Sequence, residues 1–279
     1  MRWRLVAAWN VLKACLLVAA GCAAVGAIGY EIQGYRLASL LVFFALLVAG
    51  AAYWYGDRVV LGMVGARELP VGEAPAVHAA AASLAAIATL PKPRLYVLED
   101  GLPRAFAVGR GPRGGIAVSR GLLAAAPPAE LEGVLAHELA HIRNRDVLVQ
   151  TAAVIVAAAL VETSRVGGWL QRTLLFVLGP IAAAIVHLLL SPKREFAADR
   201  AAAELCGSPH GLADALIRLE RAAELVEFRA SPATEPLYTF NPFVEEGLAG
   251  LFVTHPPIAE RVRRLRALDP DWREKLQAA

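Results

Sequence analysis

Two histidines and a glutamate have the spacing of a catalytic metal site. His137, Glu138 and His141 form an HExxH pattern, in which the histidines are four residues apart. On a helix, four residues correspond to one turn plus about 40°, so both imidazoles leave the same face and can bind one ion. Glu138 would lie beside them, next to a water held by the ion. The pattern predicts a zinc centre that activates water; the alternative is three polar residues on a solvated helix face.

A catalytic zinc ion also needs a third protein ligand and an open position. The extended pattern with glycine at 144 and histidine at 147 is excluded, because the chain has Asn144 and Val147. Another common ligand is a carboxylate on a second helix. A glutamate followed four residues later by an aspartate occurs once, at Glu195 and Asp199. These residues are candidates for a ligand and for a group that orients a histidine, unless they are unrelated surface acids.

The HExxH pattern lies in a segment with the features of a helix. Residues 128–145 begin with proline and acidic residues and carry apolar residues at helical spacing. Other segments share this helical patterning: 72–89, 191–205, 210–228 and 256–268. Short β-branched or aromatic runs, separated by glycine and proline, predict strands at 94–98, 105–108 and 115–118. A mainly helical domain with a small sheet is therefore expected around the candidate site.

The composition indicates a membrane protein. The chain has 279 residues, of which 57% are hydrophobic, and its mean hydropathy of +0.49 is too positive for an ordinary soluble enzyme. Its 28 Lys and Arg and 25 Asp and Glu residues leave a net charge of +3, which does not suggest a nucleic-acid partner. With three cysteines, a disulfide framework is not expected.

Two long apolar runs lie near the N-terminus. Residues 14–30 and 37–56 contain no charged residue, and a helix needs about 20 residues to cross a bilayer core. Basic residues precede the first run and follow the second, so both flanks are expected in the cytoplasm. A cleaved signal peptide is the alternative for the first run. Two weaker apolar runs, 147–161 and 173–190, are predicted as either transmembrane or buried core helices.

Three motifs follow one another along the chain: HELAHIRNRD at 137–146, SPKREFAADRAA at 191–202 and THPPIAERVRRL at 254–265. In this order, and with two apolar segments before the first motif and two after it, they resemble the membrane zinc peptidases of the HtpX type. That group belongs to the same broad family as the CAAX-processing membrane proteases. The resemblance covers most of the chain and implies a zincin fold.

The resemblance also implies roles for individual residues. His137, His141 and Glu195 would bind one Zn²⁺ per chain. Glu138 would be the general base, and Asp199 would orient a ligand from outside the coordination sphere.

Two further residues match the family only through the third motif. His255 and Arg261 would stabilise the oxyanion, according to the resemblance. Without it, residue 255 simply precedes a helix that starts at two prolines, and Arg261 is one of several arginines on a basic helix.

One position departs from the family pattern. Arg104 stands where the family usually has asparagine, directly before the strand at 105–108. A long cation thus replaces a small amide near the substrate-binding edge, with Asp100 and Glu99 as its candidate partners. The strand at 115–118 is expected to form an edge that binds extended substrate by strand addition.

Together these features predict an α+β, mainly helical protein: a zincin-like metallopeptidase domain with a small β-sheet and about four transmembrane or membrane-buried helices. Residues 1–57 would form a transmembrane hairpin. Residues 58–279 would form the zinc metallopeptidase domain, interrupted by the apolar helices at about 147–161 and 173–190.

The expected function is zinc-dependent endoproteolysis in the plasma (inner) membrane, by a multi-pass protein with its active site facing the cytoplasm. By resemblance, the substrates would be misfolded or damaged membrane proteins and unfolded polypeptides, cleaved in quality control under stress. The lipid bilayer is the other expected partner, nucleic acid is not expected, and self-association into a homo-oligomer stays open. The alternatives are a dedicated processing protease of the CAAX type and an inactive zinc-binding membrane scaffold.

Overall fold

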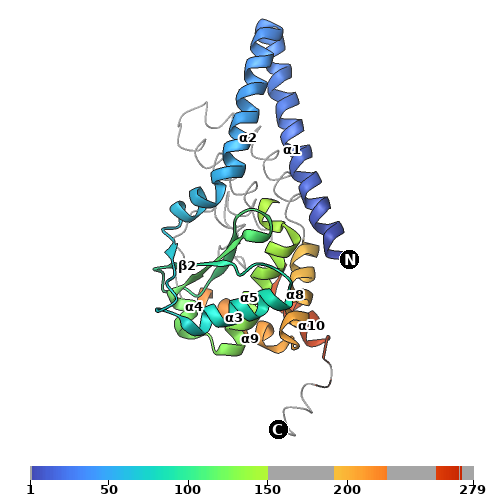
Figure 1. Cartoon of the computed structure of the whole chain (residues 1–279). Helices are drawn as coiled ribbons and strands as arrows, with labels where there is room; N and C mark the ends of the chain where they lie inside the picture. The colour runs from blue at the N-terminus through green and yellow to red at the C-terminus, as the bar shows by residue number, and fades with distance from the viewer. Residues whose placement is uncertain (1, 150–191, 225–255, 270, 272–279) are drawn as a thin grey trace.

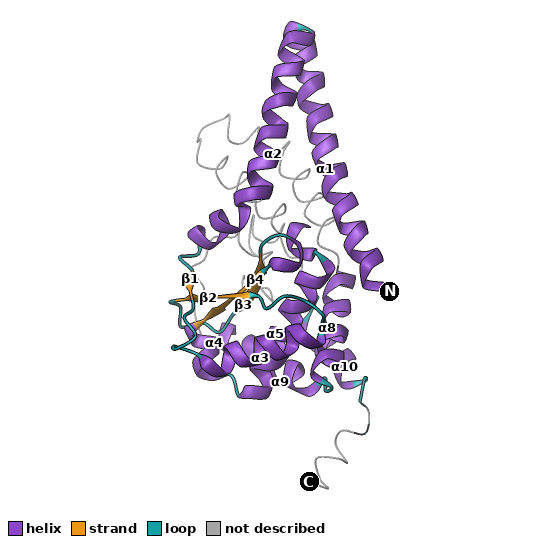
Figure 2. Ribbon diagram, viewed as in Figure 1, coloured by secondary structure: helices purple, strands orange, loops and turns teal. Residues whose placement is uncertain are grey.

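The computed structural model describes residues 2–149, 192–224, 256–269 and 271. In these ranges the chain is mainly helical with one four-stranded mixed sheet, as predicted (Figures 1 and 2). The apolar run predicted at 173–190, most of the run at 147–161, and His255 lie outside the described residues.

The two N-terminal apolar runs form a helical hairpin. Helices α1 (Arg2–Gln33) and α2 (Tyr35–Met63) are both long and apolar enough to cross a membrane. Only Gly34 separates them, in the left-handed region with φ of 68°, which glycine adopts without steric cost. The helices approach closely at Gly29, where an added Cβ would lie 2.8 Å from the Cα of Ala38. The turn between the two helices therefore consists of a single residue.

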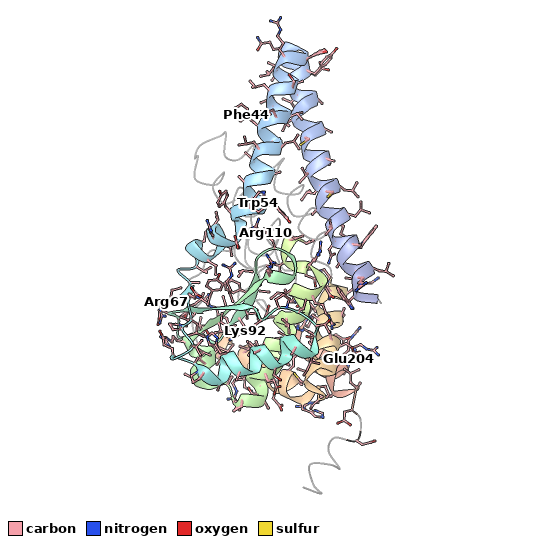
Figure 3. The ribbon with its side chains drawn as sticks, in the orientation of Figure 1. Phe44, Trp54, Arg67, Lys92, Arg110 and Glu204 are labelled. Carbon is pink, nitrogen blue, oxygen red and sulfur yellow. The ribbon has the colours of Figure 1, made fainter. Side chains whose placement is uncertain are left out.

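The hairpin projects from the rest of the described chain, here called the body (Figure 1). The N-terminal end of α1 and the C-terminal end of α2 both lie at the body, and the tip points away from it. Near the body, the Arg110 guanidinium lies 4.3 Å from the ring centroid of Trp54 (Figure 3) and 5.4 Å from that of Tyr53. Aromatic side chains at this end of α2 suit a membrane interface.

The body contains a sheet with the strand order β1-β2-β4-β3. Strands β2 (Arg94–Leu98), β3 (Ala105–Val108) and β4 (Gly115–Ser119) confirm the three predicted strands, and β1 (Arg67–Glu68) is additional. Strand β4 pairs parallel with β2 and antiparallel with β3. The prediction that residues 115–118 form an edge strand is wrong, because the turn through η1 (Gly111–Arg113) returns β4 between β3 and β2.

Helix α5 (Pro128–Asn144) is the centre of the body (Figure 2). It contacts β3, β4, the hairpin helix α1 and three helices of the body: α3 (Pro75–Ile87), α8 (Pro192–Cys206) and α9 (His210–Glu224). Its apolar side chains Leu135, Leu139 and Ile142 are buried in the main core. The short helix α4 (Arg120–Ala125) precedes α5, and α10 (Ile258–Arg266) packs on α8 and α9. The helix that carries the HExxH pattern is thus held on nearly all sides.

Candidate metal centre

The two histidines of the HExxH pattern converge as their helical spacing predicts. Their Nε2 atoms lie 3.1 Å apart, and both side chains are buried on α5. Glu138, between them in the sequence, is buried as well. The alternative of a solvated helix face is therefore excluded.

Glu195 of α8 completes a cluster of three candidate ligands. Its Oε2 lies 3.5 Å from the Nε2 of His137, and its Oε1 lies 3.6 Å from the Nε2 of His141. Tetrahedral coordination with metal–ligand bonds of about 2.0–2.1 Å separates neighbouring ligand atoms by about 3.3–3.4 Å. The Nε2–Nε2 distance and the distance from each Nε2 to one of the two Glu195 oxygens lie close to this value, and one ligand atom from each residue lies within 4.8 Å of the others, so the cluster has the dimensions of a metal site. Glu195 and Asp199 are both buried, and neither is a surface acid.

Asp199 lies behind His137, and Arg261 extends from Asp199 to the cluster itself: its Nη2 is 3.4 Å from the Nε2 of His137, and its Nη1 is 3.8 Å from Oε2 of Glu195. The Oδ1 of Asp199 is 3.0 Å from the Nδ1 of His137, on the ring edge opposite the cluster. Arg261 of α10 donates from Nε to Oδ2 of Asp199 at 2.9 Å and from Nη2 to Oδ1 at 2.6 Å. Arg261 has no exposed surface, and this two-point contact gives its charge a partner. The predicted neighbours Glu195 and Asp199 thus reach the same histidine from two sides.

These contacts determine the charge state around His137. Burial lowers the pKa of the His137 imidazole, but the Asp199 and Glu195 carboxylates outweigh this effect and raise the pKa to about 9. Burial alone would raise the pKa of Asp199, yet the Arg261 guanidinium holds it below the usual value. Asp199 is therefore a carboxylate that accepts two hydrogen bonds from Arg261 and lies beside the ring nitrogen of His137.

Asp146 has the same relation to His141, and sequence analysis missed it. Its Oδ2 lies 2.9 Å from the Nδ1 of His141, and Arg194 donates from Nε to its Oδ1 at 3.0 Å. Burial raises the pKa of Asp146, but the charge of Arg194 and the contact with His141 lower it overall. Asp146 is the last residue of the first motif, so the motif itself pointed to it. It lies five residues after His141, however, and this spacing does not place two residues on one face of a helix.

Residues 72–269 match the sequence model of Peptidase family M48. The chain belongs to this family. A protein named "Protease HtpX homolog" from Pelotomaculum thermopropionicum is 40% identical over 278 residues, which cover 93% of this chain and 99% of that protein. Proteins of the same name from Acidiphilium cryptum and Thermococcus kodakarensis are 42% and 37% identical, over 92% and 86% of this chain and 96% and 90% of their own lengths.

Membership of the M48 family makes the chain a metallopeptidase. The HtpX-type relatives, together with two helices that are long and apolar enough to cross a membrane, indicate a membrane protein. The resemblance to HtpX-type proteases is confirmed by the relatives. Because the M48 match covers 72–269, it spans every candidate residue from His137 to Arg261.

Arg104, which departs from the expected family pattern, forms the expected ion pair with Asp100. Glu99, the second expected partner, instead accepts hydrogen bonds from Arg67 and Arg120. The backbone N–H of Arg104 donates to Oγ of Ser119 at 2.9 Å, which ties the start of β3 to the end of β4. Arg104 is therefore part of the sheet's own structure.

Proposed function

We propose that the chain is a zinc-dependent endopeptidase that cleaves unfolded or damaged membrane proteins from the cytoplasmic side of the membrane. The observation that carries this proposal is the convergence of two imidazole nitrogens and one carboxylate beside a buried glutamate, with a separate aspartate behind each imidazole.

His137, His141 and Glu195 would hold the zinc ion. Two nitrogen donors and one oxygen donor suit Zn²⁺, and three protein ligands would leave one coordination position for water or substrate. Metal binding would release the Nε2 proton that His137 holds in the metal-free protein, and the aspartates at the two Nδ1 atoms would keep the remaining ring protons on Nδ1. When bound, zinc polarises a carbonyl oxygen and lowers the pKa of a water molecule to about 7.

Glu138 would act as the general base. It is on α5 directly after His137, and its negative charge is close enough to contribute to the raised pKa of Arg261. In the proposed reaction Glu138 accepts a proton from the attacking water and then delivers it to the leaving amine. His255 and Arg261 are proposed, from the family pattern, to stabilise the oxyanion. The two-point contact with Asp199 would orient Arg261 for this task.

The proposed orientation follows from charge around the hairpin. Arg2, Arg4 and Arg58 lie near the ends of α1 and α2 at the body, and Lys13 lies in the half of α1 nearer the body. The tip carries only the opposite charges of Glu31 and Arg36. An excess of basic residues is typical of the cytoplasmic side. This supports a multi-pass protein of the inner membrane with its body, and so its candidate metal centre, in the cytoplasm.

The test compares detergent-purified wild type, Glu138→Gln and a control, Glu204→Gln, which changes an exposed glutamate of α8. Each sample is assayed for cleavage of casein and of an unfolded membrane protein, and for zinc content. We expect about one zinc per chain in all three and cleavage by wild type and Glu204→Gln alone. Zinc in every sample with no cleavage would instead favour the scaffold alternative.

Product analysis separates quality control from dedicated processing. A protease of damaged proteins is expected to cut several unfolded membrane substrates at many sites. Cleavage confined to one terminal site of one substrate would favour the CAAX-type alternative.

A further inference from the structure

Asn10 is a buried polar residue in the apolar helix α1, and the proposed catalysis does not use it. Its exposed fraction is 2%, whereas its neighbours Leu5, Trp9 and Leu12 are exposed. Ala7, one turn earlier on the same face, is also buried. Helix α1 contacts α5, at the end of α1 that lies beside the body (Figure 1).

The side-chain amide of Asn10 donates two hydrogen bonds to the end of α5. Its Nδ2 lies 3.0 Å from the carbonyl oxygen of Asn144 and 2.6 Å from Oδ1 of Asp146. Both partners are acceptors, so the amide nitrogen rather than the amide oxygen must face them. A primary amide has two N–H donors, and this geometry uses both. These bonds offset the cost of burying Asn10.

Asp146 links Asn10 to the candidate metal centre. Its Oδ1 accepts from Asn10 and from Arg194, while its Oδ2 faces the Nδ1 of His141. Arg194 directly precedes Glu195 on α8. One carboxylate therefore connects α1, α5 and α8 at the point where His141 is oriented.

We infer that Asn10 is a positioning residue of the metal centre: through Asp146, the first transmembrane helix sets the orientation of the His141 imidazole. This rests on the proposed function, in which His141 binds the metal. Without the amide, Oδ1 of Asp146 would keep its hydrogen bond from Arg194 and lose its hydrogen bond from α1. The position of the Asp146 carboxylate would then depend on Arg194 alone among these two donors. The Asn144 carbonyl, at the end of α5, would also lose its hydrogen bond from Asn10. Both changes loosen the segment that holds His141.

The first test is Asn10→Leu in the full-length, detergent-purified protein. Leucine has a similar size, lacks a donor and suits an apolar helix, and Ala8→Leu at an exposed position of α1 is the control. Zinc affinity is measured by competition with a chelator, alongside kcat, KM and the Tm of the metal-free protein. We expect Asn10→Leu to raise the zinc Kd about 3–30-fold and to lower kcat with little change in KM. Ala8→Leu should match the wild type.

A second background separates orientation from a general loss of stability. If Asn10 acts through Asp146, Asn10→Leu weakens zinc binding in the wild-type background and has no further effect in Asp146→Ala. An equal loss in both backgrounds, or an unchanged zinc Kd in the wild-type background, overturns the inference. A wild type that binds zinc and cleaves nothing contradicts the proposed function instead, because zinc affinity is measured independently of turnover.

Discussion

At the scale of single residues, the candidate metal centre contains two similar series of contacts, each running from an arginine through an aspartate to a histidine. Arg261 contacts Asp199, which faces His137; Arg194 contacts Asp146, which faces His141. In each series, a buried aspartate has a buried arginine as its counter-charge. A buried carboxylate without such a partner would be strongly destabilised or would take up a proton. The aspartates can therefore stay ionised beside the histidines, and Asp146 is hydrogen-bonded to the Nδ1 of His141.

Asp199→Asn tests whether this arrangement supports metal binding. The amide keeps the size of the side chain but removes the charge that fixes the His137 tautomer. We expect zinc to bind about 10–100-fold more weakly, as measured by chelator competition. Asp214→Asn, on the exposed surface of α9, should leave the affinity unchanged. An affinity equal to that of wild type would mean that Asp199 does not orient the ligand.

Arg261→Met tests the contribution of the buried arginine to stability. The change leaves Asp199 buried without its main counter-charge, so we expect a loss of about 3–5 kcal/mol in the free energy of unfolding. Denaturant titration of the metal-free protein measures this loss. Arg263→Met removes an exposed arginine of the same helix and should cost less than about 1 kcal/mol. Equal losses for the two variants would contradict the assigned role of Arg261.

The residues of the site were predictable where helical spacing alone brings them together. His137 with His141, and Glu195 with Asp199, are each four residues apart on one helix. Asp146 was missed because it lies after α5 and returns to His141 through Arg145, whose φ of 58° is in the left-handed region. The burial of Arg261 was also unpredictable, since its helix is rich in exposed arginines.

At the scale of elements, close packing of α5 on α9 depends on two glycines. An added Cβ at Gly133 would lie 2.5 Å from the backbone nitrogen of Leu212, and one at Gly211 would lie 2.2 Å from the carbonyl oxygen of Ala129. Both obstacles are backbone atoms, which cannot move aside as a flexible side chain can. The two helices therefore approach each other at positions where only glycine fits.

Gly133→Ala should separate these helices slightly. We expect a loss of about 1–3 kcal/mol in the free energy of unfolding, the usual cost of overpacking a core. Gly72→Ala is the matched control, because a Cβ there would meet no atom within 4 Å. A Gly133→Ala variant as stable as Gly72→Ala would show that α5 and α9 shift apart without cost.

An exposed charge network connects β1 to the ends of neighbouring elements. Glu73 accepts hydrogen bonds from Arg67 and Arg120, and these contacts lower its pKa from 4.5 to about 2. A lowered carboxyl pKa stabilises the fold above pH 4.5, and this contribution disappears as the pH falls toward 2. Glu73→Gln should therefore lower the Tm at pH 7, by at most about 3 °C because the network is exposed. Thermal scans at pH 7 and pH 3 check this: the difference from wild type should shrink at pH 3, and a constant difference would contradict it.

The strands of the sheet were predictable within one residue, but their order was not. Glycine and proline mark the ends of β2, β3 and β4 in the sequence. The parallel pairing of β2 with β4 joins strands that are not consecutive, and no local residue pattern indicates it. The prediction therefore placed β4 at the edge of the sheet, where it does not lie. Strand β1, with two residues, is too short to show any alternation.

At the scale of the whole molecule, the proposed orientation puts the hairpin tip and the body on opposite sides of the membrane. Gln33→Cys at the tip and Lys92→Cys on the body (Figure 3) can be compared after Cys15, Cys22 and Cys206 are replaced by serine. In intact cells whose outer barrier is permeable to the reagent, a membrane-impermeant thiol reagent should label position 33 and not position 92. The reverse pattern would overturn the proposed orientation.

The contact between Asn10 and Asp146 joins two residues that are synthesised at different times. The two residues are 136 positions apart. Since ribosomes add about 5–20 residues per second, α1 is made roughly 7–27 s before Asp146. The hairpin thus has time to enter the bilayer before Asp146 has been synthesised. The contact with Asn10 would therefore form only after α1 has been inserted, so the orientation of His141 would be completed late, once the first helix is in the membrane.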